Sequence, residues 1–182
     1  MYAVPSKLFA SALILSSLML ANAQAAEQPP LTHNLTAVKS TAKAPSLRLQ
    51  NMDEEIVDIT KLQGKVIVVN FWATWCPPCR REMGSLERLH LATEDKNVVV
   101  LAVNVGEDID TVFSFMGTVE PSPSFPILFD TESDVMESWK VRGLPTTYIV
   151  DPSGMIKYRA VGGREFDHPE LLKSVIALTN KS

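Results

Sequence analysis

The chain has 182 residues, and its 21 Asp and Glu outnumber its 17 Lys and Arg, so the formal net charge at pH 7 is −4. A mildly acidic chain that lacks a basic patch cannot neutralise phosphates, which excludes nucleic acid as a partner. The length corresponds to about one domain and is enough to bury a substantial core.

Residues 1–25 have the layout of an export signal. Lys7 is followed by an apolar segment at residues 8–20 and by small residues that permit cleavage after Ala23 or Ala25. The apolar segment is shorter than the roughly 20 residues that cross a bilayer, which favours a cleaved signal peptide over an uncleaved inner-membrane anchor. We therefore expect a periplasmic bacterial protein that touches the membrane only if the signal stays uncleaved.

The chain after the signal divides into two parts. Residues 24–44 are rich in Ala, Pro, Thr and Gln without apolar periodicity, which predicts a flexible linker after a signal peptide at 1–23. From residue 45 the pattern becomes regular, so residues 45–182 are expected to form one domain. Apolar positions on both sides of a polar turn at 51–54 predict that this domain opens with a β-hairpin.

The middle of the chain predicts a βαβ unit. Residues 65–71 and 98–105 are almost wholly apolar, as strands covered on both faces are, and are expected to be parallel neighbours. Residues 80–93 have apolar side chains at helical spacing and supply the crossover helix. The same patterns predict a helix at 108–116, a strand at 125–129, a short helix at 133–139, an antiparallel hairpin of strands at 146–150 and 155–161, and a closing helix at 167–179.

The only two cysteines form the motif Cys76-Pro77-Pro78-Cys79, between the predicted strand at 65–71 and the helix. The first turn of a helix has unpaired N–H groups and a positive dipole end, which favour a thiolate over a thiol. Cys76 is therefore the expected nucleophile, and Cys79, one turn further on, is close enough to resolve a mixed disulfide. Pro77 and Pro78 restrict the geometry between the sulfurs and are expected to tune the redox potential.

Other uses of a C-x-x-C motif are less favoured. A structural zinc site needs four ligands, but there is no second cysteine pair and the histidines, at 33, 90 and 168, are widely scattered in sequence. Covalent haem attachment requires His directly after the second cysteine, where Arg80 stands, and is excluded. A permanent structural disulfide would close a very short loop and remove little entropy from the unfolded chain. Zinc and a structural disulfide stay open as minor alternatives to a redox-active pair that needs no metal or cofactor.

Four segments together resemble the thioredoxin superfamily, and specifically its exported TlpA/ResA/DsbE-like thiol:disulfide oxidoreductases. They are FWATWCPPC at 71–79, AVNVGE at 102–107, LPTT at 144–147 and DPSG at 151–154, and the resemblance covers about residues 45–180. It implies an α/β, thioredoxin-like three-layer sandwich with a central mixed β-sheet and an N-terminal β-hairpin. Residues 107–129 are then expected to be a helix-containing central insertion.

The resemblance also implies roles near the cysteines. Pro145 is expected to follow a cis peptide bond and to face the pair, with the backbone of Leu144 able to pair with an extended partner segment. Trp75 and Pro77 are expected to contact the substrate.

An acid–base group is expected as well. Glu82 stands where ResA-like members have an acidic residue that tunes the thiols, and a solvated glutamate on the helix surface is the alternative. Asn70 stands in place of the buried acid of thioredoxin and cannot take a proton. Acid–base help is therefore left to Glu82, Glu107 or water.

We expect an exported enzyme that reduces a specific protein disulfide by dithiol exchange, in cytochrome c maturation or metal-centre assembly. Its expected partners are a disulfide-bearing protein substrate and a membrane thiol reductant that re-reduces it. Two alternatives stay open. A thiol peroxidase of the peroxiredoxin branch would require Pro and Thr where Val69 and Ala73 stand. A copper-handling module would bind Cu(I) through Cys76, Cys79 and a histidine or methionine.

Overall fold

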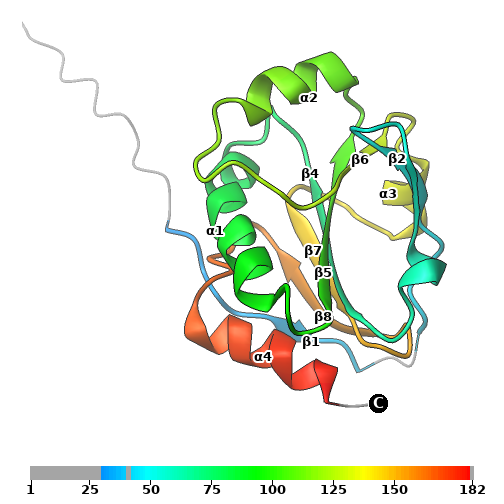
Figure 1. Ribbon diagram of the computed structural model, residues 1–182, viewed down its shortest axis with the longest axis vertical. Helices are drawn as coiled ribbons and strands as arrows, with labels where there is room; N and C mark the ends of the chain where they lie inside the picture. Colours follow the sequence, from blue (N-terminus) through cyan, green and yellow to red (C-terminus); the bar gives the residue numbers. More distant parts are fainter. Residues whose placement is uncertain (1–29, 40–41, 181–182) are drawn as a thin grey trace, which may run out of the picture.

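The computed structural model describes residues 30–39 and 42–180, which form one eight-stranded sheet and four α-helices (Figure 1). The strand order in the sheet is β1-β8-β7-β4-β5-β6-β2-β3. The strands are β1 (Thr36–Ala37), β2 (Arg48–Asn51), β3 (Ile56–Asp58), β4 (Val66–Trp72), β5 (Val98–Val105), β6 (Ile127–Asp130), β7 (Thr146–Val150) and β8 (Ile156–Val161). The helices are α1 (Pro77–Thr93), α2 (Ile109–Met116), α3 (Asp134–Ser138) and α4 (Pro169–Thr179), with a 3-10 helix at Ile59–Leu62.

The predicted signal peptide at 1–23, both cleavage points and the first part of the predicted linker lie outside the described residues. Within the described ranges, no helix is long and apolar enough to cross a bilayer.

The centre of the sheet is the predicted βαβ unit. β4 and β5 pair in parallel from Val66 opposite Val98 to Trp72 opposite Asn104, and α1 connects them. Every residue of β4 is buried, because layers cover both faces of the strand. Alternate side chains of β4 therefore enter two different cores, which explains why the strand has an unbroken apolar run.

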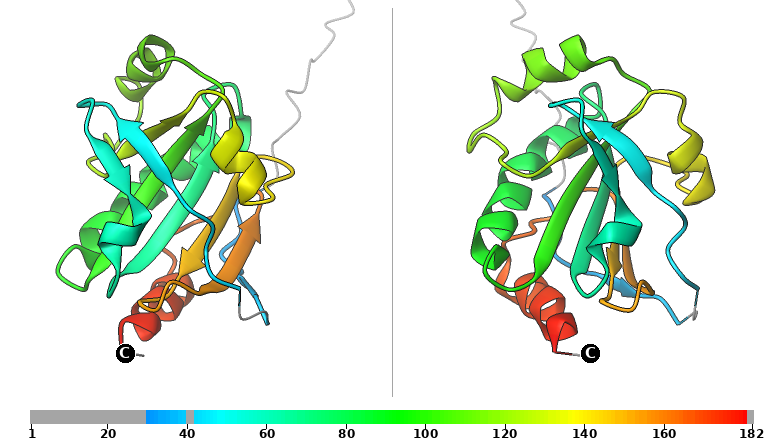
Figure 2. Two further views of the ribbon diagram at one scale, coloured as in Figure 1. Left: turned by 90° about the vertical axis from the view of Figure 1, so that its right-hand side faces the viewer. Right: turned by 45° about the vertical axis from the view of Figure 1, so that its right-hand side comes forward.

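The two cores define three layers, as the right-hand view of Figure 2 shows. On one face, α1, α2 and α4 pack against the sheet through Leu86, Phe115 and Val175, among others. On the other face, next to α3, the core contains Phe71 and Trp139, whose rings lie 5.7 Å apart. The mixed sheet between helical layers confirms the predicted three-layer α/β fold, with α2 between β5 and β6 where the central helix was expected.

The remaining strands confirm the two predicted hairpins. β2 and β3 pair antiparallel and join the sheet through β6, and β7 and β8 pair antiparallel on its other side. Some boundaries differ from the predictions by a few residues. The strand expected at 125–129 is Ile127–Asp130, and the closing helix begins at Pro169, since His168 is its N-cap.

The part of the predicted linker that the structure describes departs from the prediction. β1 pairs antiparallel with β8, as Figure 1 shows, and Ala44 donates a backbone hydrogen bond to Gly154 O at 2.9 Å. β8 would otherwise end the sheet with unpaired backbone groups, and a neighbouring segment can satisfy these whatever its side chains. Both residues of β1 are exposed, so no apolar pattern marks the strand. The prediction of a flexible linker is therefore wrong for β1.

Candidate active site

Cys76 and Cys79 form a disulfide between the end of β4 and the first turn of α1, with Cα atoms 5.3 Å apart. Cys76 is the N-cap of α1, and its Sγ accepts the backbone N–H of Cys79 at 3.4 Å. Cys79 is fully buried, whereas Cys76 keeps 3% of its surface exposed. The predicted position at the start of a helix is confirmed, and Cys76 is the more exposed of the two cysteines.

The start of α1 favours negative charge. Pro77 and Pro78 are its first two residues. Proline has no backbone N–H, and at these positions an N–H would have no hydrogen-bond partner within the helix. The first turn has no acidic residue, and the guanidinium of Arg80 lies 5.1 Å from the ring centroid of Phe115. The helix dipole and the N–H of Cys79 therefore act on Cys76 without an opposing carboxylate in that turn, which favours a thiolate in the reduced protein.

Glu107 anchors the loop that precedes Cys76. Its carboxylate accepts the backbone N–H of Thr74 at 2.7 Å and also binds the Thr74 hydroxyl. Asn104 Nδ2 donates to the same carboxylate at 2.7 Å. Glu107 thus ties the active-site loop to the end of β5, a positioning role that differs from the acid–base role considered from the sequence.

Glu82 is fully buried on α1, on the same face of the helix as Cys79. Its Oε1 accepts Asn70 Nδ2 at 2.8 Å, and its Oε2 accepts the backbone N–H of Arg164 at 2.8 Å. Asn70 Nδ2 also donates to Thr147 Oγ1 at 2.9 Å. Burial raises the pKa of Glu82 to about 8, while the hydrogen bonds and the charge of Arg164 oppose that rise. The alternative of a solvated glutamate on the helix surface is therefore wrong.

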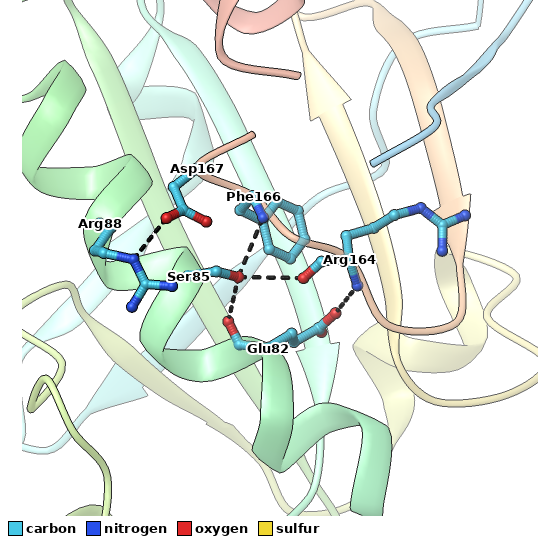
Figure 3. Close-up of polar contacts among 6 residues, drawn as sticks. All are labelled: Glu82, Ser85, Arg88, Arg164, Phe166 and Asp167. Atoms are coloured by element: carbon cyan, nitrogen blue, oxygen red, sulfur yellow. Dashed lines mark hydrogen bonds and ion pairs between the residues drawn. The ribbon is translucent and has the colours of Figure 1, made fainter. Parts of the chain in front are cut away.

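Residues 162–168, which connect β8 to α4, lie along α1 and hold Glu82 from one side (Figure 3). Ser85 Oγ accepts the backbone N–H of Phe166 at 3.1 Å and contacts the carbonyl oxygens of Glu82 at 2.8 Å and Arg164 at 3.1 Å. These contacts fix the backbone N–H of Arg164 that binds Glu82. Ser85 and Arg164 could not be predicted from the sequence, because partners this far apart in the chain leave no spacing signal.

Gly163 brings the 162–168 loop against the cysteine motif. A Cβ atom on Gly163 would lie 2.6 Å from Leu31 Cδ2 and 3.2 Å from Pro78 O. Glycine is therefore required by a close approach of three segments: the N-terminal segment, the loop and the start of α1. An ion pair of 2.6 Å between Arg88 and Asp167 holds the other end of the loop on α1 (Figure 3).

Replacing Gly163 with alanine is expected to lower the free energy of unfolding by about 1–3 kcal/mol, the usual cost of overpacking. The end of Leu31 can move, but the Pro78 carbonyl belongs to the backbone of α1 and cannot yield as easily. Urea unfolding measures the free energy of unfolding of the variant. Gly143→Ala is the control, because no atom lies within 4 Å of a Cβ placed on Gly143. Equal stability of the two variants would contradict the close packing.

The other predicted site residues lie around this centre. Trp75 is 68% exposed, whereas Trp72, three residues earlier, is fully buried. The Leu144–Pro145 peptide bond is cis, as the resemblance implied, and Leu144 packs against the core cluster that contains both cysteines. Pro145 O accepts the N–H of Gly162 at 2.9 Å, which joins this turn to the 162–168 loop. The expected orientation of Pro145 toward the cysteine pair stays a prediction.

Comparison with known proteins places the chain in a family. Residues 41–159 match the AhpC/TSA family. The chain is 36% identical over 122 residues to the thiol-disulfide oxidoreductase ResA of Geobacillus thermodenitrificans, a match that covers 67% of this chain and 69% of that protein. It belongs to the ResA-like thiol-disulfide oxidoreductases of the AhpC/TSA family. ResA of Bacillus subtilis is 31% identical over 120 residues. The match covers 66% of this chain and 66% of that protein, so the chain spans about two thirds of the length of this relative.

Solved structures agree with this membership. A crystal structure from Chlorobium tepidum assigned to the thiol:disulfide interchange protein DsbE superposes with a TM-score of 0.71 at 26% identity, covering 81% of this chain and 100% of that one. MTB DsbF, solved in mixed oxidised and reduced forms, gives a TM-score of 0.65 at 26% identity and covers 72% of this chain and 94% of that one. The resemblance to ResA-like and DsbE-like oxidoreductases is thereby confirmed.

Proposed function

We propose that the chain is an exported thiol:disulfide oxidoreductase that reduces a specific protein disulfide. The observation that carries the proposal is the combination, on one helix, of the Cys76–Cys79 pair at the N-terminus and the buried Glu82 on the next turn. The helix start supports a thiolate on Cys76, and the pKa of Glu82 near 8 suits proton exchange with a thiol.

In the proposed reaction, the Cys76 thiolate attacks one sulfur of the substrate disulfide and releases the other substrate sulfur as a thiolate. Cys79 then loses its proton to the ionised form of Glu82, which is the minor form below about pH 8, attacks the Cys76 sulfur and breaks the mixed disulfide. Two electrons pass to the substrate, whose two released thiolates take up protons from water, and the Cys76–Cys79 disulfide remains. When that disulfide is reduced again, Glu82 returns its proton to Cys79 as the leaving group.

The reduced form has to be regenerated by a second dithiol. Because an exported protein works where disulfides persist, we propose that a membrane thiol reductant supplies these two electrons. Relatives named ResA and DsbE support the exchange chemistry, and cytochrome c maturation or metal-centre assembly is the proposed setting. Leu144, Pro145, Trp75 and Pro77 form the proposed contact surface, with the Leu144 backbone pairing with an extended substrate segment.

Trp75→Ala is expected to raise the KM for a protein disulfide substrate by about tenfold or more, since exposed aromatic side chains often dominate contact energies. Its reaction with dithiothreitol, which needs no protein contact surface, should be unchanged. Phe113→Ala is the matched control, because Phe113 is also 68% exposed but lies on α2. Kinetics with both substrates check the prediction, and equal KM values for the two variants would contradict it.

Covalent trapping tests the proposed function directly. A Cys79→Ser variant should hold its substrate through Cys76 in a mixed disulfide that dithiothreitol releases, and mass spectrometry identifies the captured protein.

A redox titration of the wild-type pair should give a potential nearer the roughly −270 mV of thioredoxin than the roughly −120 mV of DsbA. Absence of any mixed disulfide, or a strongly oxidising potential, would overturn the proposal of a substrate reductase.

The two alternatives predict different results. A thiol peroxidase would consume hydrogen peroxide rapidly without a protein substrate, although Val69 and Ala73 occupy the signature positions and both are buried. A copper module would retain Cu(I) through dialysis and lose it in Cys79→Ser. Within residues 30–39 and 42–180, the group of three or more clustered His, Cys, Asp and Glu side chains includes neither cysteine.

A further inference from the structure

Two histidines that are far apart in sequence lie side by side on the surface. His33, in the N-terminal segment, and His168, the N-cap of α4, stack with ring centroids 3.7 Å apart and an interplanar angle of 7°. His33 Nε2 lies 3.4 Å from Glu170 Oε2. One nitrogen of each ring and one carboxylate oxygen of Glu170 all lie within 4.8 Å of one another. The fold has therefore gathered three possible metal ligands that the sequence spacing did not indicate.

Backbone contacts hold both sides of this cluster in place. Thr32 O accepts the N–H of Glu165 at 2.7 Å, and Asn34 O accepts Arg164 Nε at 2.7 Å, so the residues on either side of His33 are fixed to the 162–168 loop. His168 N donates to Glu165 O at 3.2 Å, and Glu170 follows in the first turn of α4. The cluster thus rests on backbone that is already ordered by other interactions.

We propose that His33, His168 and Glu170 bind one Zn²⁺ ion, with water as the fourth ligand. Two imidazoles and a carboxylate form an established ligand set for zinc, with bonds of about 2.0–2.2 Å. Ligand atoms in a tetrahedral site of that size lie about 3.3 Å apart. The contact of 3.4 Å between His33 and Glu170 already matches this spacing. The rings need only to tilt out of their parallel stack so that the nitrogen lone pairs converge, and all three side chains reach solvent.

Binding requires one local exchange of interactions. His168 Nδ1 accepts the N–H of Glu170 at 3.3 Å, so the neutral ring carries its proton on Nε2. An ion bound at Nδ1 takes the place of the Glu170 N–H on that nitrogen. An ion bound at Nε2 shifts the ring proton to Nδ1, which can then no longer accept the Glu170 N–H. Both imidazoles must be neutral to bind, so Zn²⁺ affinity should fall when the solution is acidified. The bound ion would fasten the N-terminal segment to α4, and the site is independent of the proposed thiol chemistry.

Equilibrium dialysis of the full chain without a histidine tag tests the site, with Zn²⁺ alone as the probe and the Cys76–Cys79 pair oxidised so that thiolates do not compete. We expect one Zn²⁺ per chain, and at least about a tenfold loss of affinity in His33→Ala and in His168→Ala. Glu170→Gln should also weaken binding, whereas Glu165→Gln, an exposed neighbour outside the cluster, should not. His90→Gln serves as the control for the remaining histidine.

Amide hydrogen exchange gives a second measurement. Zn²⁺ should slow exchange in β1 of the wild type, which begins three residues after His33, but not in His33→Ala. The proposal is overturned if the oxidised wild type retains no Zn²⁺, if both histidine variants bind it as tightly as the wild type, or if binding appears only after reduction. The last result would place the ion on the cysteines.

Discussion

Replacing Cys76 with serine should lower the rate of dithiol exchange by at least about a thousandfold, because a hydroxyl is a far weaker nucleophile than a thiolate. Cys76 is the cysteine that keeps some exposed surface and caps α1, so the loss should affect the first chemical step. The release of a coloured thiolate from a small aromatic disulfide measures that step directly.

Cys79→Ser is the matched variant, since both substitutions remove the same disulfide and differ only in which sulfur remains. Cys79→Ser should release one equivalent of coloured thiolate per chain at a rate close to that of the wild type and then stop, because the resolving sulfur is absent. If Cys79→Ser were the inert variant and Cys76→Ser reacted once, the roles assigned to the two cysteines would be reversed.

The buried carboxyl of Glu82 should make folding stability depend strongly on pH. Its pKa is raised from 4.5 to about 8. Below about pH 4.5 the carboxyl is protonated in both the folded and the unfolded chain, so Glu82 does not lower the stability there. Between these two values the unfolded chain has lost the proton and the folded chain keeps it, so each pH unit lowers the free energy of unfolding by about 1.4 kcal/mol. The total loss by pH 8 is on the order of several kcal/mol.

Glu82→Gln should remove this slope, because the amide carries no charge at any pH, while the loss of one of the two accepted hydrogen bonds shifts the stability equally at every pH. Urea unfolding from pH 5 to pH 9 measures the free energy of unfolding of both proteins. The variant should become increasingly more stable than the wild type as the pH rises. Glu87→Gln is the control, since Glu87 is also a buried glutamate on α1 but accepts hydrogen bonds from Ser124. A wild type and a Glu82→Gln variant with parallel pH profiles would show that Glu82 is not titrating in this range.

The sequence was sufficient to predict features that a local pattern encodes. The unbroken apolar runs of β4 and β5 identified two strands covered on both faces, and the helical spacing after Cys79 identified α1. The cis bond before Pro145 followed from the resemblance, since a proline before a strand does not by itself indicate it.

Features made by the backbone, or by distant pairs, could not be predicted. β1 pairs with β8 through main-chain groups while both of its side chains are exposed, so no periodicity accompanies it. The burial of Glu82 depends on Asn70 and on the 162–168 loop, which cover it from different parts of the chain. A charged residue on an amphipathic helix is usually solvated, and only the tertiary structure shows that this one is not.

The hydrogen bond from residue 164 to Glu82 has a consequence for how relatives can diverge. The donor is a backbone N–H, which every amino acid except proline carries, so the side chain at position 164 can change without loss of this bond. Ser85, by contrast, uses its hydroxyl both to accept and to donate, and Gly163 has no room for a Cβ. Evolutionary constraint from this hydrogen bond should therefore fall on a serine, a glycine and the exclusion of proline, while the bond itself places no demand on the side chain at position 164.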